Sequence, residues 1–178
     1  MPTAEKKLIS QPGAVPGKLP GTKPWNRVNL PVYSISSKKG DACNMNIITY
    51  ASAISMKPKR FVCGIYHDTK TLENTASTGE FVLQLLSSSQ YRLVTLLGKQ
   101  SGNNIDKTAL LHKRDELQWW KGYPVLKNCL AVMLLKTLQE FDAGDHQCFI
   151  CDVTAYKNCN PGQPLTLDIL RQHKLVRI

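Results

Sequence analysis

The segment Asp68–Thr71 carries two hydroxyl groups and one ammonium group within four residues. A helix is expected to begin here, because Asp68, Thr69 and Thr71 are all N-cap candidates, and the free amides of a helix N-terminus favour an anion. Thr69, Lys70 and Thr71 therefore form a candidate phosphate site. The Asp68 carboxylate would repel a phosphate, so it should turn away and cap the helix, or the anion site should lie slightly later. A plain capped surface helix with a solvated lysine explains the same residues equally well.

A second set of short polar side chains lies on an apolar background between residues 44 and 55: Asn44, Asn46, Thr49, Ser52 and Ser55. If this segment is extended, Thr49 and Tyr50 point to opposite faces, so that one side chain can contact a ligand while the other packs against the protein. The pattern suits one wall of a ligand site. An ordinary strand whose Thr and Ser side chains face solvent is the competing interpretation.

Two histidines and a tryptophan pair are further candidates. His146 follows Gly144 and Asp145 at the start of an expected strand, where a structural hydrogen bond with Asp145 competes with a catalytic role. His67 either approaches a bound phosphate or is merely exposed. Trp119-Trp120 is expected in a loop that packs over an edge or an interface. No nucleophile with a catalytic triad is visible.

Six cysteines invite a disulfide or zinc interpretation: Cys43, Cys63, Cys129, Cys148, Cys151 and Cys159. Cys148 and Cys151 lie in an apolar run typical of a strand, and three residues along a strand place the two sulfurs on opposite faces. They therefore cannot share one tetrahedral metal without a bulge. We expect buried, reduced thiols and no metal site.

The composition excludes several classes of protein. The chain has 178 residues, with 23 Lys and Arg against 13 Asp and Glu, which favours anionic partners such as nucleic acid or a phosphorylated cofactor. No block of like charges or stripe of aromatic residues supports nucleic acid. The longest apolar run, Leu130 to Leu135, is six residues and too short to span a membrane. With no apolar stretch in the first ten residues, we expect a cytoplasmic protein without membrane contact.

The chain divides into a flexible N-terminal arm, residues 1–24, which holds five of the ten prolines, and a single domain, residues 25–178. Six β-rich runs are expected in the domain: 30–36, 44–50, 60–66, 80–86, 130–138 and 147–156. Two short helices are expected, over 69–77 and 90–97, ending before Gly79 and Gly98. This pattern excludes a doubly wound sheet. It indicates an all-β fold, a small antiparallel barrel closed to remove strand edges, with helices at its ends.

The order of motifs from Asn29 to Tyr156 resembles the flavin reductase-like family of FMN-binding split barrels. The motifs are Asn44-Met-Asn-Ile-Ile-Thr-Tyr-Ala-Ser-Ala-Ile-Ser55-Met-Lys-Pro58, Thr69-Lys-Thr71-Leu-Glu-Asn74, Thr78-Gly-Glu-Phe-Val-Leu-Gln-Leu85, Ser101-Gly-Asn-Asn-Ile-Asp106-Lys107, Pro124-Val-Leu-Lys and Gly144-Asp-His146. Two positions depart from the family's pattern, since Lys59 replaces a proline and Gln84 stands where Asn is usual. These motifs, taken together and in this order, make the resemblance specific.

The resemblance implies a split β-barrel of Greek-key type that binds FMN, with FAD as an alternative. It implies that Ile48 to Ala51 border the isoalloxazine ring, and the full set of expected flavin-binding residues is Asn46, Ile47, Ile48, Thr49, Tyr50, Ala51, Ser55, His67, Thr69, Lys70 and Thr71. His146 is the candidate catalytic residue, through placement of the reduced nicotinamide.

The activity that the resemblance implies is flavin reduction in a homodimer, with hydride passing from NADH or NADPH to flavin N5. Two alternatives stay open. One is a flavoredoxin-like electron carrier that holds FMN tightly, and the other is a basic nucleic-acid-binding barrel of a different class.

Overall fold

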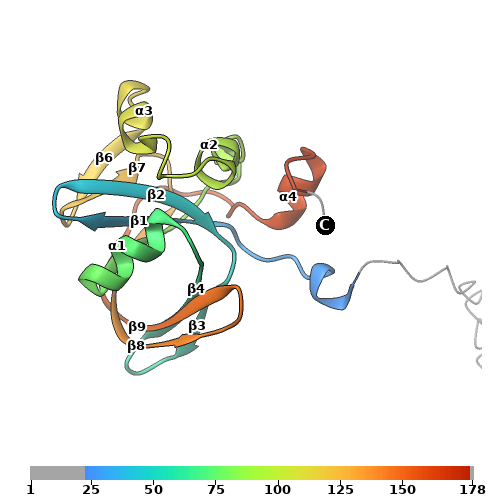
Figure 1. Ribbon diagram of the computed structural model, residues 1–178. Helices are drawn as coiled ribbons and strands as arrows, with labels where there is room; N and C mark the ends of the chain where they lie inside the picture. The colour runs from blue at the N-terminus through green and yellow to red at the C-terminus, as the bar shows by residue number, and fades with distance from the viewer. Residues whose placement is uncertain (1–22, 177–178) are drawn as a thin grey trace, which may run out of the picture.

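The computed structural model describes residues 23–176, which form a β-rich body flanked by short helices (Figure 1). The strands are β1 Tyr33–Lys39, β2 Ala42–Ile48, β3 Ala51–Ser55, β4 Arg60–Tyr66, β5 Glu80–Leu85, β6 Leu117–Trp120, β7 Tyr123–Leu126, β8 Ala131–Asp142 and β9 His146–Asn158. The α-helices are α1 Lys70–Thr78, α2 Leu93–Lys99, α3 Lys107–Lys113 and α4 Leu167–Gln172, and two 3₁₀ helices are η1 Pro24–Asn26 and η2 Ser88–Gln90. The expected arm, residues 1–24, lies outside the described residues except for Lys23 and Pro24. Within the described part of the chain, no helix has the length and apolar character to cross a membrane.

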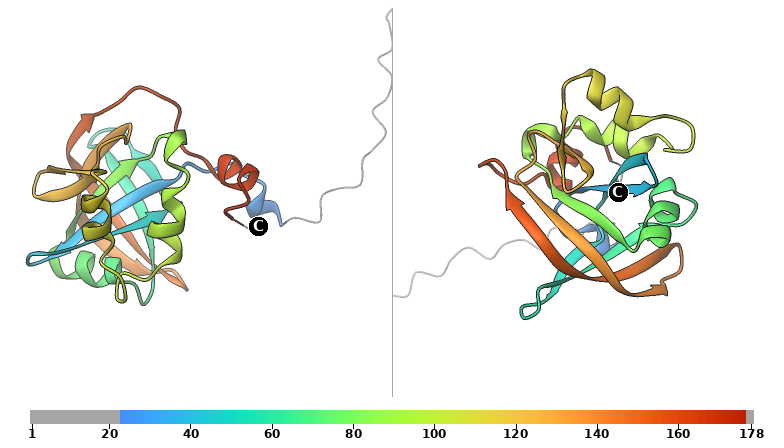
Figure 2. Two further views of the ribbon diagram at one scale, coloured as in Figure 1. Left: turned by 90° about the horizontal axis from the view of Figure 1, so that it is seen from above. Right: turned by 90° about the vertical axis from the view of Figure 1, so that its left-hand side faces the viewer.

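Seven strands form one antiparallel sheet in the order β2-β1-β5-β8-β9-β4-β3, and β6 and β7 form a separate hairpin. The two edge strands, β2 and β3, are consecutive in the chain and are joined only by Thr49 and Tyr50. The sheet therefore has to curl until its edges meet at this link, as the views in Figures 1 and 2 show. The antiparallel all-β prediction is confirmed. The expected closure is wrong, because no ladder joins β2 to β3 in the described residues.

Both faces of the curled sheet are covered, which explains the continuous apolar run in β5. Phe81 and Leu83 point into a core inside the curl, together with Ile35, Phe149 and Cys151. Val82 and Leu86 point to the other face, where a second core packs against α2, α3, α4 and the β6–β7 hairpin. Side chains alternate between faces along a strand, so a strand buried on both sides is apolar throughout.

Several element boundaries differ from the sequence-based expectation; the first expected strand, for example, runs over Tyr33–Lys39 and not over 30–36. The strand expected over 44–50 ends at Ile48, so Thr49 and Tyr50 lie between β2 and β3. The helix expected over 90–97 begins as the 3₁₀ helix η2 and continues as α2, which includes Gly98. Trp119 and Trp120 lie in strand β6 and not in a loop. By contrast, β4 has the expected bounds, and α1 ends at Gly79, whose φ of 64° allows the left-handed C-cap.

Gln84 connects the main sheet to the β6–β7 hairpin through a buried network. Its Nε2 donates to Ser36 Oγ at 2.8 Å, and its Oε1 accepts from the backbone N–H of Leu126 at 2.8 Å. Ser36 Oγ in turn donates to the carbonyl of Pro124 at 2.6 Å. Both side chains are fully buried, so neither water nor another group can replace a lost partner.

Gln84→Leu should therefore lower the free energy of unfolding by about 2–3 kcal/mol, because it leaves a buried N–H without an acceptor. Chemical denaturation of the purified variant measures this change. Gln139→Leu, on an exposed position of β8, is the matched control and should change stability by less than about 0.5 kcal/mol. Equal effects of the two substitutions would contradict the role of the network.

Candidate functional site

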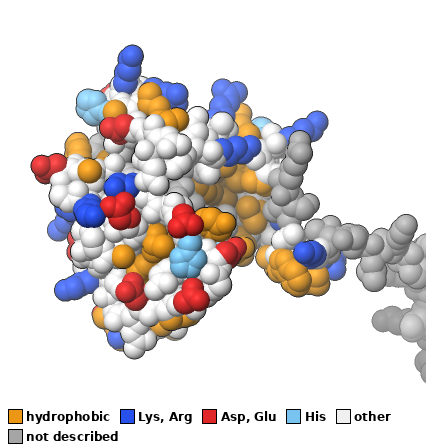
Figure 3. Space-filling view, in the orientation of Figure 1, with side chains coloured by type: hydrophobic (Ala, Val, Ile, Leu, Met, Phe, Trp, Pro, Cys, Tyr) orange, Lys and Arg blue, Asp and Glu red, His pale blue; other side chains and the backbone are white. Residues whose placement is uncertain are grey.

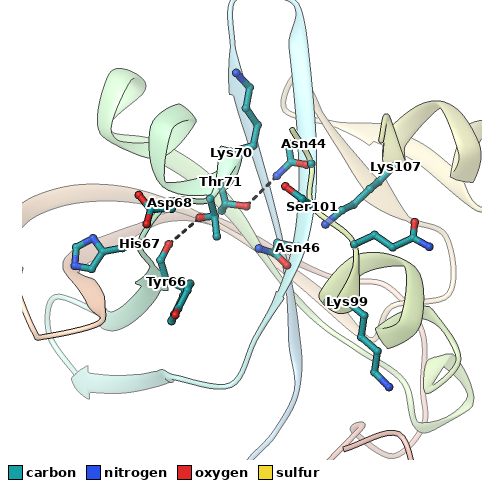
Figure 4. A pocket seen from close by; sticks show the side chains of 14 residues that line it. Asn44, Asn46, Tyr66, His67, Asp68, Lys70, Thr71, Lys99, Ser101 and Lys107 are labelled. Carbon is teal, nitrogen blue, oxygen red and sulfur yellow. Dashed lines mark hydrogen bonds between the residues drawn. The ribbon is translucent and has the colours of Figure 1, made fainter. Parts of the chain in front are cut away.

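A cavity of about 290 Å³ opens between strand β2, the end of β4, the start of α1 and the loop after α2 (Figure 4). Its lining residues are Asn44, Asn46, Tyr66, His67, Asp68, Thr69, Lys70, Thr71, Gly98, Lys99, Gln100, Ser101, Gly102 and Lys107. Five of the expected flavin-binding residues are among them, namely Asn46, His67, Thr69, Lys70 and Thr71. The fold thus brings the hydroxyl-rich segment of the sequence to a cavity.

Helix α1 begins at this cavity with a threonine cap. Thr69 Oγ1 accepts from the backbone N–H of Leu72 at 3.2 Å and donates to the carbonyl of Tyr66 at 2.8 Å. Of the three N-cap candidates, Thr69 caps the helix, so the alternative in which Asp68 caps it is wrong; Asp68 adopts a φ of 58°. Asp68 lines the cavity, and in Figure 4 its carboxylate lies on the side away from Lys107.

Thr71 lies fully buried on the first turn of α1 and faces β2. Its Oγ1 accepts a hydrogen bond from Asn44 Nδ2 at 2.9 Å, as Figure 4 shows, and the hydroxyl proton has no acceptor among the described residues. That proton is available to a ligand. A buried hydroxyl beside the free amides of a helix N-terminus is a strong donor set for a phosphate oxygen.

Lys107 places a buried cation on the opposite wall. The residue is 2% exposed, and its Nζ donates to the carbonyl of Leu97 at 2.7 Å, in the last turn of α2. No carboxylate pairs with it among the described residues, so the ammonium has further protons to donate. In Figure 4 this ammonium points toward the cavity. Burial lowers the pKa of Lys107 to about 8, which an anion in the cavity would counteract.

Lys70, the cation expected from the sequence to bind phosphate, has a different environment. Its Nζ pairs with Glu73 at 2.9 Å, and Glu73 also pairs with Lys39 at 2.9 Å. These two lysines lower the pKa of Glu73 to about 2 through their hydrogen bonds and charges. The Lys70 ammonium points away from the centre of the cavity in Figure 4. The structure therefore places Lys107, and not Lys70, as the buried cation of the cavity.

A smaller hollow of about 160 Å³ continues from the first cavity and shares Asn46 and Tyr66 with it. Its other lining residues are Ile47, Ile48, Thr49, Tyr50, Gly64, Ile65 and His146. The segment from Asn46 to Tyr50 thus forms one wall of this hollow. Gly64 permits the approach of the other wall, because its N–H donates to the Tyr50 carbonyl at 2.7 Å and a Cβ there would lie 3.2 Å from Tyr50 Cβ.

His146 lies between two tyrosine rings at the mouth of the small hollow. Its ring meets those of Tyr50 and Tyr66 edge to face, with centroids 4.9 and 5.2 Å away. Nδ1 is 2.6 Å from Asp145 Oδ1, so the hydrogen bond expected with Asp145 is present. That bond is the main cause of the lowered pKa of Asp145. The pairing holds the ring in place and leaves Nε2 free of protein partners among the described residues.

Two expected residues lie elsewhere. Ala51 begins β3 and packs against the inner core, and Ser55 lies at the far end of β3, in a hollow lined also by Ile54 and Arg60. His67 does line the main cavity, but its Nε2 is 3.2 Å from Asp142 Oδ1, on the outer side. The structure therefore brings together most, but not all, of the residues predicted from the sequence.

Sequence reasoning did not assign Gly102 or Lys107 to the site, and it left Asn44, one of the polar side chains on the candidate ligand wall, out of the flavin-binding set. A signal was present in the stretch from Ser101 to Lys107, which is one of the family motifs but does not by itself show which of its residues face a ligand. Lys107 lies 36 positions after Thr71 in the sequence, and only the packing of α2 and α3 against β2 brings it to the cavity.

Gly102 is the closest neighbour of Asn44 in the cavity wall. A Cβ at this position would overlap the Asn44 side-chain amide and lie 2.8 Å from its Cγ. Gly102→Ala should displace Asn44 from Thr71 and lower the free energy of unfolding by about 1–3 kcal/mol, with weaker ligand binding. Gly98→Ala is the matched control, because its Cβ would meet Ile47 at an ordinary 3.5 Å and helix propensity favours alanine. Thermal unfolding distinguishes the two, and a Gly102→Ala variant as stable as Gly98→Ala would contradict the geometry.

The buried lysine also predicts a pH dependence of stability. The pKa of Lys107 is about 8 in the folded chain, below the ordinary lysine value of 10.5 that applies when the chain is unfolded. Between these values the unfolded chain binds a proton that the folded chain does not, so the free energy of unfolding should rise with pH from about 8 to 10.5. Denaturant unfolding at several pH values measures this slope, and Lys107→Met should reduce it. A slope unchanged in the variant would show that Lys107 is not its source.

The sequence matches the family described as flavin reductase like domain over residues 25–173. A high molecular weight rubredoxin from Moorella thermoacetica is 29% identical over 156 residues, which cover 86% of this chain and 66% of that protein. The chain spans only 21% and 22% of the length of two putative diflavin flavoproteins from Nostoc, which are 26% and 24% identical. It thus corresponds to part of these longer proteins.

Solved structures show the same fold. An FMN-binding protein from Thermus thermophilus superposes with a TM-score of 0.68 at 21% identity, covering 84% of this chain and 80% of that chain. A flavoredoxin from Methanosarcina acetivorans superposes with a TM-score of 0.66 at 16% identity, covering 84% and 76%. The match to the family extends over the curled sheet, the cavity and the β6–β7 hairpin. The chain therefore belongs to the flavin reductase-like family.

Proposed function

We propose that this protein binds FMN and reduces flavin with NADH or NADPH as the electron donor. The observation that carries the proposal is a pair of adjacent hollows that share Asn46 and Tyr66: one has a buried cation and a helix N-terminus, and the other has aromatic and backbone groups. A phosphorylated, flat, tricyclic ligand matches this distribution of groups.

The larger cavity fits the phosphate of FMN. Lys107 at the start of α3 supplies a cation, and the first turn of α1 supplies the Thr71 hydroxyl and backbone donors. Lys107 and Thr71 each have a proton that no protein group in the described part of the chain accepts. Leaving buried donors without acceptors destabilises a protein, so these two protons indicate that a ligand with acceptor oxygens, such as a phosphate, binds here. FAD would place its first phosphate in the same site, and the rest of the FAD molecule would lie outside the cavity.

The smaller hollow fits the edge of the flavin ring. The backbone from Asn46 to Tyr50 can form hydrogen bonds with heteroatoms of the flavin ring, because Thr49 and Tyr50 lie outside the strand ladders of β2 and β3. When bound, FMN would supply the redox chemistry by accepting a hydride at N5. The protein's part is to place two flat rings face to face, and the His146 ring, held by Asp145, is positioned to border the nicotinamide.

The proposal includes a homodimer. Two exposed aromatic side chains lie at the ring end of the cleft, Tyr50 (59% exposed) and Tyr66 (55%), and Ile54 (50%) is exposed toward the far end of β3. They continue onto Leu138 and Phe141 of β8, and Figure 3 shows hydrophobic and acidic side chains together with a histidine over this part of the sheet. A second copy packed here would cover the ring end of the cleft and protect it from water. Six free thiols support a reducing compartment such as the cytoplasm.

The second candidate function is a flavin-dependent electron carrier. The similarity to a flavoredoxin and to a high molecular weight rubredoxin favours it. A carrier would keep FMN bound and turn over slowly with reduced nicotinamide, whereas a reductase would consume it rapidly.

The test is the visible spectrum of the freshly isolated protein, followed by absorbance at about 340 nm after mixing with NADH or NADPH and free FMN. Flavin absorption and rapid loss of reduced nicotinamide are expected. Flavin absorption without turnover would favour the carrier. A colourless protein that does not bind added FMN, but binds oligonucleotides in a salt-sensitive way, would overturn both.

A further inference from the structure

Two cysteines outside the cleft lie on adjacent chain segments at the end of the β8–β9 ladder. The last paired residues of that ladder are Ala131 and Asn158, and Cys129 and Cys159 lie just beyond them on the two strands. The backbone N–H of Cys159 donates to the carbonyl of Leu130 at 2.8 Å, so the two chain segments stay adjacent after the ladder ends. Extending the register by one step sets Leu130 opposite Cys159, so Cys129 is the chain neighbour of the residue that Cys159 faces, and both cysteines pack in or against the same outer core.

Asn160 holds the two segments together from the side. Its Nδ2 donates to the carbonyl of Cys129 at 2.8 Å and to that of Lys127 at 2.9 Å. The turn before Cys129 is closed by its own N–H, which donates to the Leu126 carbonyl at 3.3 Å. Both chain segments that carry the cysteines are therefore held in place by hydrogen bonds to the backbone.

The two thiols interact with one another and differ in exposure. Cys129 is fully buried in the core that packs on α2 and α4, and Cys159 is half-buried against the same core. Burial raises the pKa of the Cys129 thiol to about 12, and the Cys159 thiol adds to the shift through its charge and a side-chain hydrogen bond. An oxidant from solvent can therefore reach Cys159 first, with Cys129 directly behind it.

We propose that Cys129 and Cys159 form a redox-sensitive dithiol, which a peroxide converts to an intrachain disulfide. The Cys159 thiolate attacks one oxygen of hydrogen peroxide, the O–O bond breaks, and hydroxide leaves, giving a sulfenic acid. The Cys129 sulfur then attacks the Cys159 sulfur, the S–O bond breaks, and the thiol proton leaves with the hydroxide as water. Two thiols lose two electrons in total, one peroxide gains them, and two water molecules form with the disulfide.

A second thiol pair in the chain provides an internal comparison. Cys63 and Cys151 lie on adjacent strands β4 and β9 and both point into the inner core, where each is fully buried. Burial raises the pKa of Cys63 well above its ordinary value, and the nearby Cys151 adds to the shift. Neither sulfur is open to solvent, so this pair should stay reduced while Cys129 and Cys159 react.

The test treats the full-length protein with hydrogen peroxide, blocks the remaining thiols with an alkylating reagent under denaturing conditions, and records intact and peptide masses. The expected result is a loss of about 2 Da before alkylation, four alkylated thiols in place of six, and a peptide pair joined through Cys129 and Cys159. Dithiothreitol should restore all six. Added peroxide is the only oxidant needed, so the outcome does not depend on whether the chain reduces flavin.

Variants separate this pair from other reactive thiols. Cys129→Ser should abolish the disulfide and leave a sulfenic acid on Cys159 that dimedone traps, whereas Cys159→Ser should abolish both products. Cys43→Ser is the matched control, because Cys43 is another partly exposed thiol, and it should form the disulfide at the wild-type rate. Six free thiols after treatment, oxidation of Cys159 without a link to Cys129, or a link through Cys43 or Cys148 in the wild-type protein would each overturn the proposal.

Discussion

Lys107→Met should weaken FMN binding about 30-fold, equivalent to about 2 kcal/mol, because a buried ammonium loses its charged hydrogen bond to phosphate. The cation lies on the cavity wall, is 2% exposed, and has one protein acceptor among the described residues, the Leu97 carbonyl at 2.7 Å. Methionine keeps most of the length and the apolar stem of the side chain, so the wall stays filled. Titration of the apoprotein with FMN, followed by quenching of flavin fluorescence, measures the change.

Lys99→Met is the control for this substitution. Lys99 also borders the cavity, but its ammonium points away from the centre in Figure 4. It should change FMN affinity by less than about threefold, the size expected for an exposed charge near an anion. Similar losses in both variants would mean that general charge, and not the buried ammonium, attracts the ligand. Unchanged affinity in Lys107→Met would remove Lys107 from the site.

Thr71→Val should weaken FMN binding about tenfold, or about 1.4 kcal/mol, because valine matches threonine in shape but donates no proton. The hydroxyl is buried and accepts from Asn44 at 2.9 Å, which directs its own proton toward the cavity. Thr71→Ser retains the hydroxyl and should restore most of the affinity. Equilibrium dialysis against FMN measures all three proteins, and thermal unfolding shows whether the loss of the Asn44 partner also affects the fold.

Comparing substitutions of Lys70 and Lys39 shows what Lys70 contributes to FMN affinity. Both pair with Glu73 at 2.9 Å, but only Lys70 borders the cavity. If Lys70 acts only through its ion pair, Lys70→Ala and Lys39→Ala should have equally small effects on FMN affinity. A tenfold loss confined to Lys70→Ala would show that its ammonium turns to the phosphate in the complex, as the sequence pattern indicates.

Local sequence signals were enough for much of the fold. The strand Arg60–Tyr66 and the end of α1 at Gly79 were predicted from a β-rich apolar run and a glycine C-cap, which act over a few residues. The hairpin β6–β7 and helices α3 and α4 were missed. Their apolar faces are short, and they are stable because they pack on the outer core of the sheet and not because of local propensity.

In the candidate site, too, some features could be predicted from local sequence and others arise only from the tertiary structure. The hydroxyls of Thr69 and Thr71 and the polar run from Asn46 were visible in the sequence, because residue type and a helix start are local properties. The choice of Thr69 over Asp68 as the cap depended on backbone torsions that the sequence does not display. Lys107 was invisible as a ligand group because burial, which makes its charge effective, arises only when α2 and α3 pack against β2.

The amino-acid sequence by itself determined the antiparallel β class, the family and the residue types that can bind a phosphorylated ligand. The tertiary structure decided which cation faces the cavity, which hydroxyl has a free proton, and which two of six thiols lie together at the end of the β8–β9 ladder. The physical reason is range: propensities and motifs act between near neighbours in the chain, whereas burial and desolvation depend on groups that meet only after the sheet has curled.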